Sequence, residues 1–495
     1  MSSLIAEKYD AEEFDKVWAS GDPDGGIGIG TLYHHAKETG LWADPRNTAA
    51  NQESYGDIKN ARLFATMFNS KLTFVSSTGK WLRWNNERWE WCEKDEQMHC
   101  AKLVAEKLML DAQALFKSDP DKGKKPIQHA MNSHNLSRLD AAVKLAISEH
   151  GMAATIQELD TKPMLVGVQN GVVDLKSGEL LVNRPEMLIT RFCNANHVLS
   201  AQCPLWLKFL FEVFEGDLET IETIQRALGY TLTGSVTEEV LFICFGRGSN
   251  GKSVFNNVTS GIYGDYARMA PASLLTVRGG ADTGPRNDLA ALAGARYVAI
   301  NELQSGDRLD EQIVKLLAGR EIISARFLHK EFFEYMPTFK PWLRTNHKPI
   351  VTGDDDGIWR RLVLIPFSRS FSAEEKDPHL ESKLLEERDG IFMWMLEGAR
   401  KWQKDGLKLS TRIKNEINTY RNDSDLLGEF IAEKCATNPN EKVEQSILFQ
   451  RWQYWCESNG VKHGSKATFS KRLSERGYVE SKSNGKRFYA GLEQL

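Results

Sequence analysis

An apolar run that leads directly into a glycine-rich loop is the feature that most limits what this chain can fold into. Val240–Phe245 is apolar, and the eight residues after it read Gly-Arg-Gly-Ser-Asn-Gly-Lys-Ser, which fits the pattern GxxxxGK[ST]. A helix is predicted to follow, from Ser253 through Val258. A buried strand, this loop and a helix, in that order, are typical of an α/β fold with a phosphate-binding loop.

The loop predicts binding of ATP with Mg²⁺. Glycine lets the backbone fold tightly, so that successive N–H groups face the phosphates, and the helix that follows adds its positive N-terminal end. Lys252 is expected to contact the β- and γ-phosphate oxygens, and the Ser253 hydroxyl to bind the metal. A glycine-rich turn without a nucleotide is the alternative. The predicted nucleotide-binding residues are Gly246, Gly248, Ser249, Asn250, Gly251, Lys252 and Ser253.

A second apolar run, Tyr297–Ile300, is followed by Asn301 and Glu302. Ligands of open α/β sheets bind at the carboxyl ends of the strands, so Glu302 is predicted to orient and deprotonate the attacking water. An ordinary carboxylate at a strand end is the alternative. Because Asn301 is not an aspartate, the predicted metal ligands are only Ser253 and Glu302, together with the phosphates.

Polar residues also follow the third apolar run and precede the fourth. Asn346 ends the third run and is a candidate sensor of the γ-phosphate or of the attacking water. Arg360 and Arg361 stand just before the fourth run. They could bind Asp354–Asp356 at the surface, or one of them could act as an arginine finger on the nucleotide of a neighbouring subunit.

These segments, within about residues 159–367, resemble the superfamily 3 helicases, and more narrowly the phage/plasmid primase–helicase family with its poxvirus-type relatives. The resemblance is carried by IQRALGYTLTGSVTEEVLFICFGRGSNGKS, DLAALAGARYVAINEL and FKPWLRTNHKPIVTGDDDGIWRRLVLIPF. It implies an AAA+-like P-loop NTPase core that forms a hexamer and moves 3′→5′ on one DNA strand. It gives Glu302 the Walker B role, Asn346 the sensor role, and Arg361, with Arg360 as second choice, the finger role.

The resemblance further implies a channel-lining hairpin between Glu302 and Asn346. Arg326, His329 and Lys330 are near its expected tip, where positive charge would grip DNA phosphates. An ordinary exposed hairpin is the alternative. Members of the family often carry Gly-Gly-Asp where this chain has Ala318-Gly319-Arg320, so the loop before the hairpin is expected to differ.

The N-terminal part is expected to be α+β. Residues 1–60 resemble the helical segment that follows the primase domain in longer relatives, which implies that priming activity is absent from this chain. Residues 61–235 are predicted to form a collar and docking region. It contains a β-meander whose tryptophans either fill a small sheet or stack single-stranded bases. These are Trp81, Trp84, Trp89 and Trp91.

Two further expectations concern helices of the same region. Ser118–Pro126 reads as a solvated linker, with DNA contact as the alternative, because it is charged and contains Pro and Gly. Trp206–Gly229 is predicted to be one helix, since Leu207, Leu210, Phe211 and Phe214 recur at steps of three and four residues.

Three modules complete the predicted domain organisation. Residues 236–370 form the ATPase core, 371–424 a helical extension, and 425–495 a winged helix-turn-helix. Lys471 and Arg472 would lie on the third helix of that module and Lys486 on its wing. Basic residues at these positions suit binding of duplex or forked DNA. Docking of another protein is the alternative role for this module.

Composition narrows the setting of the protein. The formal net charge of the 495 residues is −4, so a nucleic-acid site must be a local basic surface. The seven cysteines form no CxxC pair, the N-terminus lacks an apolar signal region, and the apolar runs are too short to span a bilayer. A cytoplasmic protein, in bacterial or host cytosol, with no membrane partner is therefore expected.

The sequence as a whole predicts an ATP-dependent replicative DNA helicase of a phage, plasmid or integrated mobile element. Its expected partners are single-stranded and forked DNA, further copies of the chain in a hexameric ring, and a separate primase or polymerase. An initiator or loader ATPase that remodels origin DNA without processive unwinding is the main alternative. A P-loop enzyme of another kind, such as a small-molecule kinase, is the second.

Overall fold

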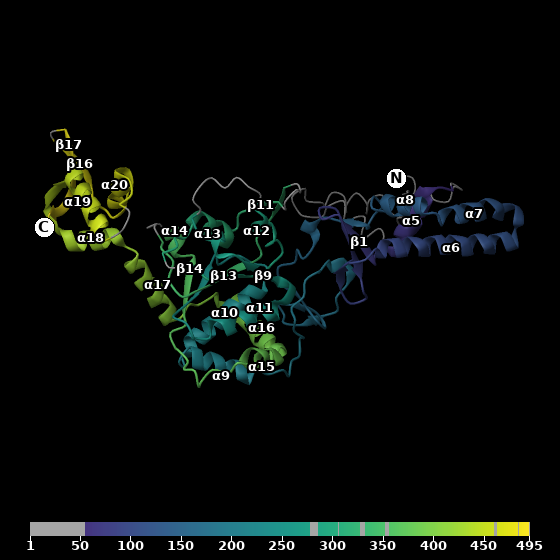
Figure 1. The fold of residues 1–495 in the computed structure, drawn as a ribbon, viewed down its shortest axis with the longest axis horizontal. Coiled ribbons are helices and arrows are strands. Elements are labelled where there is room, and N and C mark those ends of the chain that lie inside the picture. Colours follow the sequence, from purple (N-terminus) through teal and green to yellow (C-terminus); the bar gives the residue numbers. More distant parts are fainter. Residues whose placement is uncertain are drawn as a thin grey trace, which may run out of the picture. The chain divides into compact units, whose positions relative to one another are not determined.

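The computed structural model describes residues 55–277, 286–304, 306–326, 332–351, 356–459, 463–483 and 485–494. The described chain divides into two compact units (Figure 1). The first comprises residues 55–83 and 91–154, and the second comprises residues 84–90 and everything from 155 onward. Within these described ranges, no helix has the length and apolar character needed to cross a bilayer.

Helices dominate the first unit and cover a small sheet. The helices are α5 (Asp57–Phe68), α6 (Glu96–Ser118), α7 (Pro120–Ser133) and α8 (Leu136–Ala146). The sheet has the order β3 (Trp89–Trp91), β2 (Lys80–Trp84), β1 (Leu72–Val75), β4 (Ala153–Ala154).

The tryptophans of the predicted β-meander do not share one environment. Trp81 is buried, and its ring lies 5.3 Å from that of Phe74 and 6.3 Å from that of Phe64. Trp89 is buried as well, whereas Trp91 is 40% exposed. Trp81 and Trp89 therefore serve as packing residues, whereas Trp91 is partly exposed to solvent.

The predicted linker at 118–126 is wrong, because α6 and α7 are separated by Asp119 alone. The Asp119 side chain caps α7 by accepting a hydrogen bond from a backbone N–H three residues later. Pro120 suits the first turn, where a backbone N–H has no partner within the helix. A Cβ added at Gly123 would lie 2.4 Å from the Cα of Phe116, so glycine permits the two helices to lie side by side (Figure 1).

A five-stranded parallel sheet forms the centre of the second unit, as the predicted α/β class requires. Its order is β14 (Leu362–Pro366), β8 (Leu241–Phe245), β13 (Lys340–Thr345), β10 (Tyr297–Ile300), β9 (Ala267–Ala270). A smaller antiparallel sheet precedes it, with the order β5 (Leu165–Val168), β6 (Gly171–Asp174), β7 (Leu180–Leu181).

Side chains alternate between the two faces of the parallel sheet, and a hydrophobic cluster covers each face. In β8, Phe242 and Cys244 belong to one cluster, and Leu241 and Ile243 belong to the other. The first cluster includes side chains of α9 (Pro204–Val213), α10 (Leu218–Leu232), α11 (Lys252–Tyr263), α15 (Leu380–Glu386) and α16 (Arg388–Asp405). The second includes α12 (Asn287–Ala290), α13 (Glu311–Ala318), α14 (Asp356–Trp359) and Tyr420 of α17 (Thr411–Asp423) (Figure 1).

The predicted single helix over 206–229 is wrong, since α9 ends at Val213 and α10 begins at Leu218. Glu215 and Gly216 between them have left-handed φ angles of 55° and 77°, which no α-helix continues through. Of the four apolar residues whose spacing predicted the helix, Leu210 and Phe214 are buried. Leu207 and Phe211 are 44% and 54% exposed.

The C-terminal part of the second unit has its own sheet and its own core. It contains three helices and three strands, and the sheet order is β15-β17-β16. Phe430, Trp452, Trp455 and Phe469 pack together in its core. The elements in chain order are α18 (Leu426–Lys434), β15 (Cys435–Glu444), α19 (Gln445–Ser458), α20 (Lys466–Glu475), β16 (Glu480–Ser483) and β17 (Lys486–Gln494).

Candidate functional site: a phosphate-binding loop and an arginine cluster

The loop between β8 and α11 has the backbone shape that its glycines predict. Gly246, Ser249 and Gly251 have positive φ angles of 149°, 62° and 85°. A Cβ added at Gly246 would lie 2.2 Å from the carbonyl oxygen of Phe367, so a side chain there would collide with backbone. Gly248 faces open space and is exposed, which leaves the outer side of the loop accessible.

Lys252, the first residue of α11, turns its side chain back over this loop. Its Nζ donates to the carbonyl oxygen of Gly246, to Oδ1 of Asn250 at 3.1 Å and to Oδ1 of Asn346 at 3.2 Å. Burial lowers the pKa of Lys252. All three acceptors are neutral, so no hydrogen-bonded carboxylate cancels the charge of the ammonium group, and that charge is available to an anion.

The loop is also tied to the chain that follows β14. The Asn250 side chain is buried, and its Nδ2 donates to the carbonyl oxygen of Phe367 at 3.0 Å. The backbone N–H of Phe371 donates to the carbonyl oxygen of Ser249 at 2.8 Å. The side chain of Asn250, predicted to bind nucleotide, therefore holds the loop in shape, and only its backbone remains for a phosphate.

Glu302 and Asn346 meet beside the loop, because β10 and β13 are neighbouring parallel strands and their carboxyl ends share an edge. Nδ2 of Asn346 donates to Oε1 of Glu302. The Asn346 amide thus joins the ammonium group of Lys252 to the carboxylate of Glu302. The structure brings together three residues that lie far apart in the sequence and that the sequence predicted for one site.

The residues at this edge fit Mg²⁺ only as minor ligands. Ser253 and Glu302 are both exposed and present oxygen donors, which Mg²⁺ prefers. Across the described residues, no group of three or more His, Cys, Asp and Glu side chains is arranged to hold a metal ion. Such an ion would therefore be bound largely by phosphate and water oxygens, as Mg²⁺ usually is in nucleotide sites.

The two predicted finger arginines lie at the opposite edge of the sheet. Nη2 of Arg361 lies 2.6 Å from Oε2 of Glu239, and Nη2 of Arg360 lies 3.7 Å from the same oxygen. Nε of Arg320 lies 3.3 Å from Oε1 of Glu239. We call these three arginines, with Glu239, the arginine cluster.

The cluster is out of reach of the phosphate loop of its own chain. The backbone N–H of Leu241, the first residue of β8, donates to the carbonyl oxygen of Arg361, whereas the loop leaves the far end of β8. At ~3.3 Å per residue the two ends of β8, Leu241 and Phe245, are about 13 Å apart, more than the length of an arginine side chain. Any action of these arginines on a nucleotide must therefore involve another copy of the chain.

The sequence did not indicate Glu239 as the partner of Arg360 and Arg361, for which it offered Asp354–Asp356 as alternative partners. Asp356 pairs with Arg421 at 2.5 Å, and Asp354 and Asp355 lie outside the described residues. The only sequence signal for Glu239 is an acidic residue before an apolar strand, which is too common to single it out.

The residues predicted to bind DNA are less completely described. The expected hairpin is confirmed, since β11 (Ile323–Ala325) and β12 (Phe333–Tyr335) pair antiparallel. The Arg326 guanidinium lies 4.6 Å from the ring centre of Phe332 near its tip. His329 and Lys330 lie outside the described residues.

In the C-terminal module, Lys471 and Arg472 lie on α20 and Lys486 begins β17. Nζ of Lys486 is 2.7 Å from Oε2 of Glu444, so its charge is partly compensated within the module.

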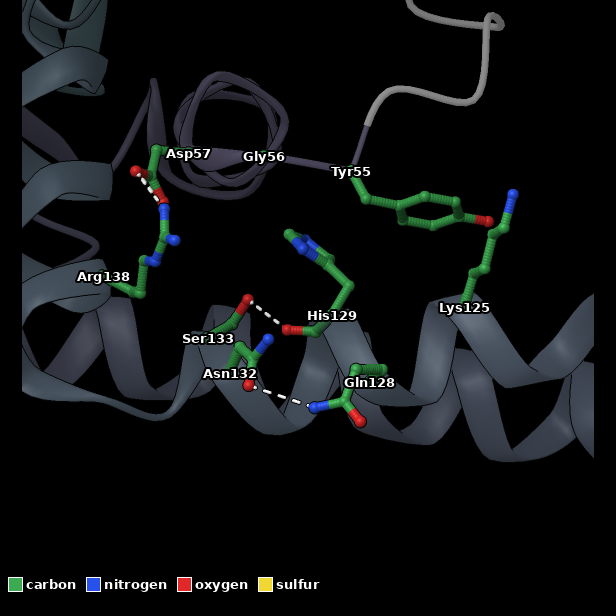
Figure 2. A pocket seen from close by; sticks show the side chains of 9 residues that line it. All are labelled: Tyr55, Gly56, Asp57, Lys125, Gln128, His129, Asn132, Ser133 and Arg138. Atoms are coloured by element: carbon green, nitrogen blue, oxygen red, sulfur yellow. Dashed lines mark hydrogen bonds and ion pairs between the residues drawn. The ribbon is translucent and has the colours of Figure 1, made fainter.

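A polar pocket of about 330 Å³ lies in the first unit, among α5, α7 and α8 (Figure 2). Its polar groups largely bind one another: Arg138 pairs with Asp57 at 2.6 Å, and Gln128 donates to Asn132 at 3.2 Å. None of the predicted site residues lines it. The pocket is therefore separate from the predicted chemistry.

Two family models match this chain, one before and one after the residues that form the parallel sheet. Residues 61–215 match the family described as D5 N terminal like, and residues 422–489 match the family described as Poxvirus D5 protein-like. The predicted relationship to poxvirus-type proteins of this kind is thereby confirmed.

Viral proteins are among the relatives of the chain. "Putative helicase L207/L206" of Acanthamoeba polyphaga mimivirus is 27% identical over 419 residues, which are 77% of this chain and 43% of that protein. "Putative primase C962R" of African swine fever virus is 22% identical, over 61% of this chain and 34% of its own length. "Putative helicase 184R" of Invertebrate iridescent virus 6 is 26% identical, over 48% and 25%. The chain thus spans less than half the length of these curated relatives.

Solved structures of the apo NrS-1 C terminal region also align with this chain. One covers 86% of this chain and 97% of its own length, at 13% identity and a TM-score of 0.46.

Proposed function

We propose that this chain is an ATP-dependent DNA helicase of superfamily 3 that works in DNA replication as a ring of copies on single-stranded DNA. The observation that carries the proposal is the hydrogen-bonded series from Lys252 through Asn346 to Glu302, beside an accessible glycine-rich loop. The names of the viral relatives support a helicase over other P-loop enzymes.

The geometry suits hydrolysis of a nucleoside triphosphate. The loop backbone and Lys252 would bind the β- and γ-phosphates, where a cation and aligned N–H groups stabilise the charge that spreads over the transferring phosphoryl group. Glu302 would accept a proton from the attacking water. The water oxygen would then bond to the γ-phosphorus while the bond from that phosphorus to the bridging oxygen of ADP breaks. Mg²⁺, when bound near Ser253 and Glu302, would neutralise phosphate charge. Asn346 would hold the side chains of Glu302 and Lys252 in a fixed position relative to each other.

The position of the arginine cluster supports a ring of several copies. Arg360 and Arg361 would complete the site of a neighbouring copy, since they cannot reach their own. The resemblance of the sequence to the phage/plasmid primase–helicases favours a hexamer and an origin in a virus or other mobile element.

Contacts to DNA are assigned to two places. The β11–β12 hairpin, with Arg326, His329 and Lys330, would hold phosphates of the strand in the ring. The C-terminal module, whose order of helices and strands suits a winged helix, would bind forked DNA through Lys471, Arg472 and Lys486. A primase or polymerase on another polypeptide would be its replication partner.

Lys252→Ala tests the assignment directly. ATP turnover stimulated by single-stranded DNA should be lost, because the variant lacks the cation at the phosphates, by a factor on the order of 10³ or more. The melting temperature should stay close to that of wild type, and Lys404→Ala, an exposed lysine on α16, should keep full turnover. Turnover by Lys252→Ala at the wild-type rate would contradict the proposal.

A strand-displacement assay on a tailed duplex tests the helicase step separately. The wild-type chain should release the shorter strand with ATP and not with a non-hydrolysable analogue. Efficient ATP turnover with no displacement would instead identify an ATPase that remodels origin DNA without unwinding it.

A further inference from the structure

The arginine cluster holds more positive charge than a single arginine finger requires. Its four residues come from three places in the sequence: Arg320 follows α13, Arg360 and Arg361 stand between α14 and β14, and Glu239 precedes β8. One carboxylate gathers all three guanidinium groups within 4 Å. Within the cluster, three positive charges therefore face one negative charge.

Arg361, the residue that the sequence favoured as the finger, is the most firmly held member. Its side chain is only 11% exposed, and besides the bond to Glu239 its Nη1 donates to the carbonyl oxygen of Gly357 at 2.6 Å. Two bonds to its own chain fix Arg361 and, through it, the orientation of the Glu239 carboxylate.

Arg320 and Arg360 are the members that face outward. Their side chains are 57% and 67% exposed, and their contacts with Glu239 are the longer ones, at 3.3 and 3.7 Å. Nη2 of Arg320 also donates to the carbonyl oxygen of Thr237 at 2.8 Å, which directs its guanidinium along the same edge. Two outward guanidinium groups that share one carboxylate suit an anion with several oxygens, because each can bind phosphate with two parallel hydrogen bonds.

Glu239 itself has a left-handed φ of 52°, a conformation that is uncommon for residues other than glycine. A turn holds it there, in which its backbone N–H donates to the carbonyl oxygen of Val236 at 3.2 Å. This backbone conformation points the carboxylate at the arginines, so Glu239 is fixed in a position from which it can orient them.

We infer that Arg320 acts together with Arg360 on the γ-phosphate of ATP bound to a second copy of this chain, and that Glu239 is the positioning residue that sets the two guanidinium groups side by side. The inference rests on the proposed function. The anion cannot be the nucleotide of the same chain, since the length of β8 separates the two sites. A phosphate of the DNA backbone is the other possible source of the anion, and the test distinguishes the two.

The test compares Arg320→Ala, Arg360→Ala and Glu239→Gln with two matched controls. Arg421→Ala removes an exposed arginine whose partner is Asp356, and Glu238→Gln removes the neighbouring carboxylate, which accepts a bond from Trp402. ATP turnover is measured at saturating single-stranded DNA, ATP affinity with a fluorescent ATP analogue, DNA affinity with a labelled oligonucleotide, and assembly by size-exclusion chromatography with light scattering.

Arg320→Ala should lower kcat roughly tenfold or more, the effect of losing one charge-assisted contact in the transition state. Its ATP affinity and assembly should be unchanged, because its own loop is intact. Mixing it with Lys252→Ala should restore turnover, since each variant supplies the part that the other lacks. Glu239→Gln should show the same reduction in kcat and the same rescue, and the controls should keep wild-type values.

Three results would overturn the inference while leaving the proposed function in place, provided that Lys252→Ala is inactive. The first is wild-type kcat in Arg320→Ala or Glu239→Gln. The second is a loss of kcat in Arg320→Ala that no mixture with Lys252→Ala restores, although Arg360→Ala is restored. The third is a loss that reflects weaker, salt-sensitive DNA binding, which would assign the cluster to the DNA backbone. Arg320→Lys keeps the positive charge but lacks the paired N–H donors of the guanidinium group. It is the second variant to measure if Arg320→Ala does not fold.

Discussion

Lys340, the first residue of β13, is a buried cation whose observed partners are neutral. Its side chain is 1% exposed, its Nζ donates to the carbonyl oxygens of Thr233 at 2.5 Å and Thr338 at 3.3 Å, and it lies 4.5 Å from the ring centre of Tyr230. Burial, and then the nearby Arg296, lower the pKa of Lys340 well below its usual 10.5. Folding therefore disfavours the charged form of this lysine.

This shift predicts a pH dependence that Lys340→Met removes. Between the lowered pKa of the folded state and the usual value, the unfolded chain binds more protons than the folded chain, so stability rises with pH in that window. The unfolding free energy of wild type minus that of Lys340→Met should increase from about pH 7 to about pH 10. Urea denaturation of both proteins measures it, and subtraction cancels the cysteines and tyrosines they share. A flat or falling difference would contradict the lowered pKa.

At the residue scale, the sequence could predict the site at the carboxyl ends of the parallel strands but not the arrangement of the arginines. Glu302 and Asn346 closely follow the ends of two neighbouring parallel strands, and Lys252 follows β8 through the glycine-rich loop, so the sheet and this loop together bring the three residues to one place. Arg360 and Arg361 are adjacent, and no spacing rule says which one turns inward. That choice depends on Glu239, whose position comes from a turn and a left-handed φ that the sequence does not encode in a recognisable pattern.

The crossing of α10 and α16 depends on two glycines, one on each helix. A Cβ added at Gly229 would lie 2.0 Å from the backbone nitrogen of Ala399, and one added at Gly398 would lie 1.9 Å from the carbonyl oxygen of Gln225. The two backbones are therefore in contact at this point. Close approach here buries Phe392, Met395 and Leu396 on the inner side of α16.

Gly398→Ala is expected to destabilise the protein by about 1–3 kcal/mol, because the added methyl group must push the two helices apart. Glu397→Ala, on the exposed side of the same helix, should change stability by no more than ~0.5 kcal/mol. Chemical denaturation followed by circular dichroism measures both. Equal stability of the two variants would show that the helices can separate at this point without cost.

At the element scale, the sequence predicted the strands that carry the site, but it misplaced helix boundaries in two segments and did not predict the strands β4, β9 and β15. Pro and Gly at 118–126 favour a linker, but Pro also starts helices and Gly123 fits a close helix contact. The apolar spacing in 206–214 continued across a turn, because periodicity does not register a left-handed residue such as Glu215. Cys435–Glu444 lacks apolar alternation, and its strand β15 is held by backbone pairing with β17.

Over the whole molecule, apolar burial is divided among separate cores. The cluster between Leu427 and Leu492 shares no residue with the two clusters that flank the parallel sheet, and the first unit has a cluster of its own. Segments with their own cores unfold as separate cooperative units unless large interfaces couple them.

Differential scanning calorimetry should accordingly resolve more than one transition. A chain that ends at residue 424 should lose one transition and keep the others within roughly 2 °C, since no residue of the remaining clusters is removed. The isolated fragment 425–495 should melt at the temperature of the transition that was lost. A single transition in the full chain, or a shift of all transitions on truncation, would contradict this independence.

The parallel direction of the central sheet has a consequence for how the protein behaves in dilute solution. Because all five strands point the same way, the glycine-rich loop and the arginine cluster lie at opposite ends of the parallel sheet. Under the proposed function, a single molecule carries both the phosphate-binding loop and the arginines, but its arginines cannot reach its own loop. The specific activity would then depend on protein concentration, because hydrolysis requires two molecules to associate. Dilute protein would be folded and bound to ATP but would not hydrolyse it.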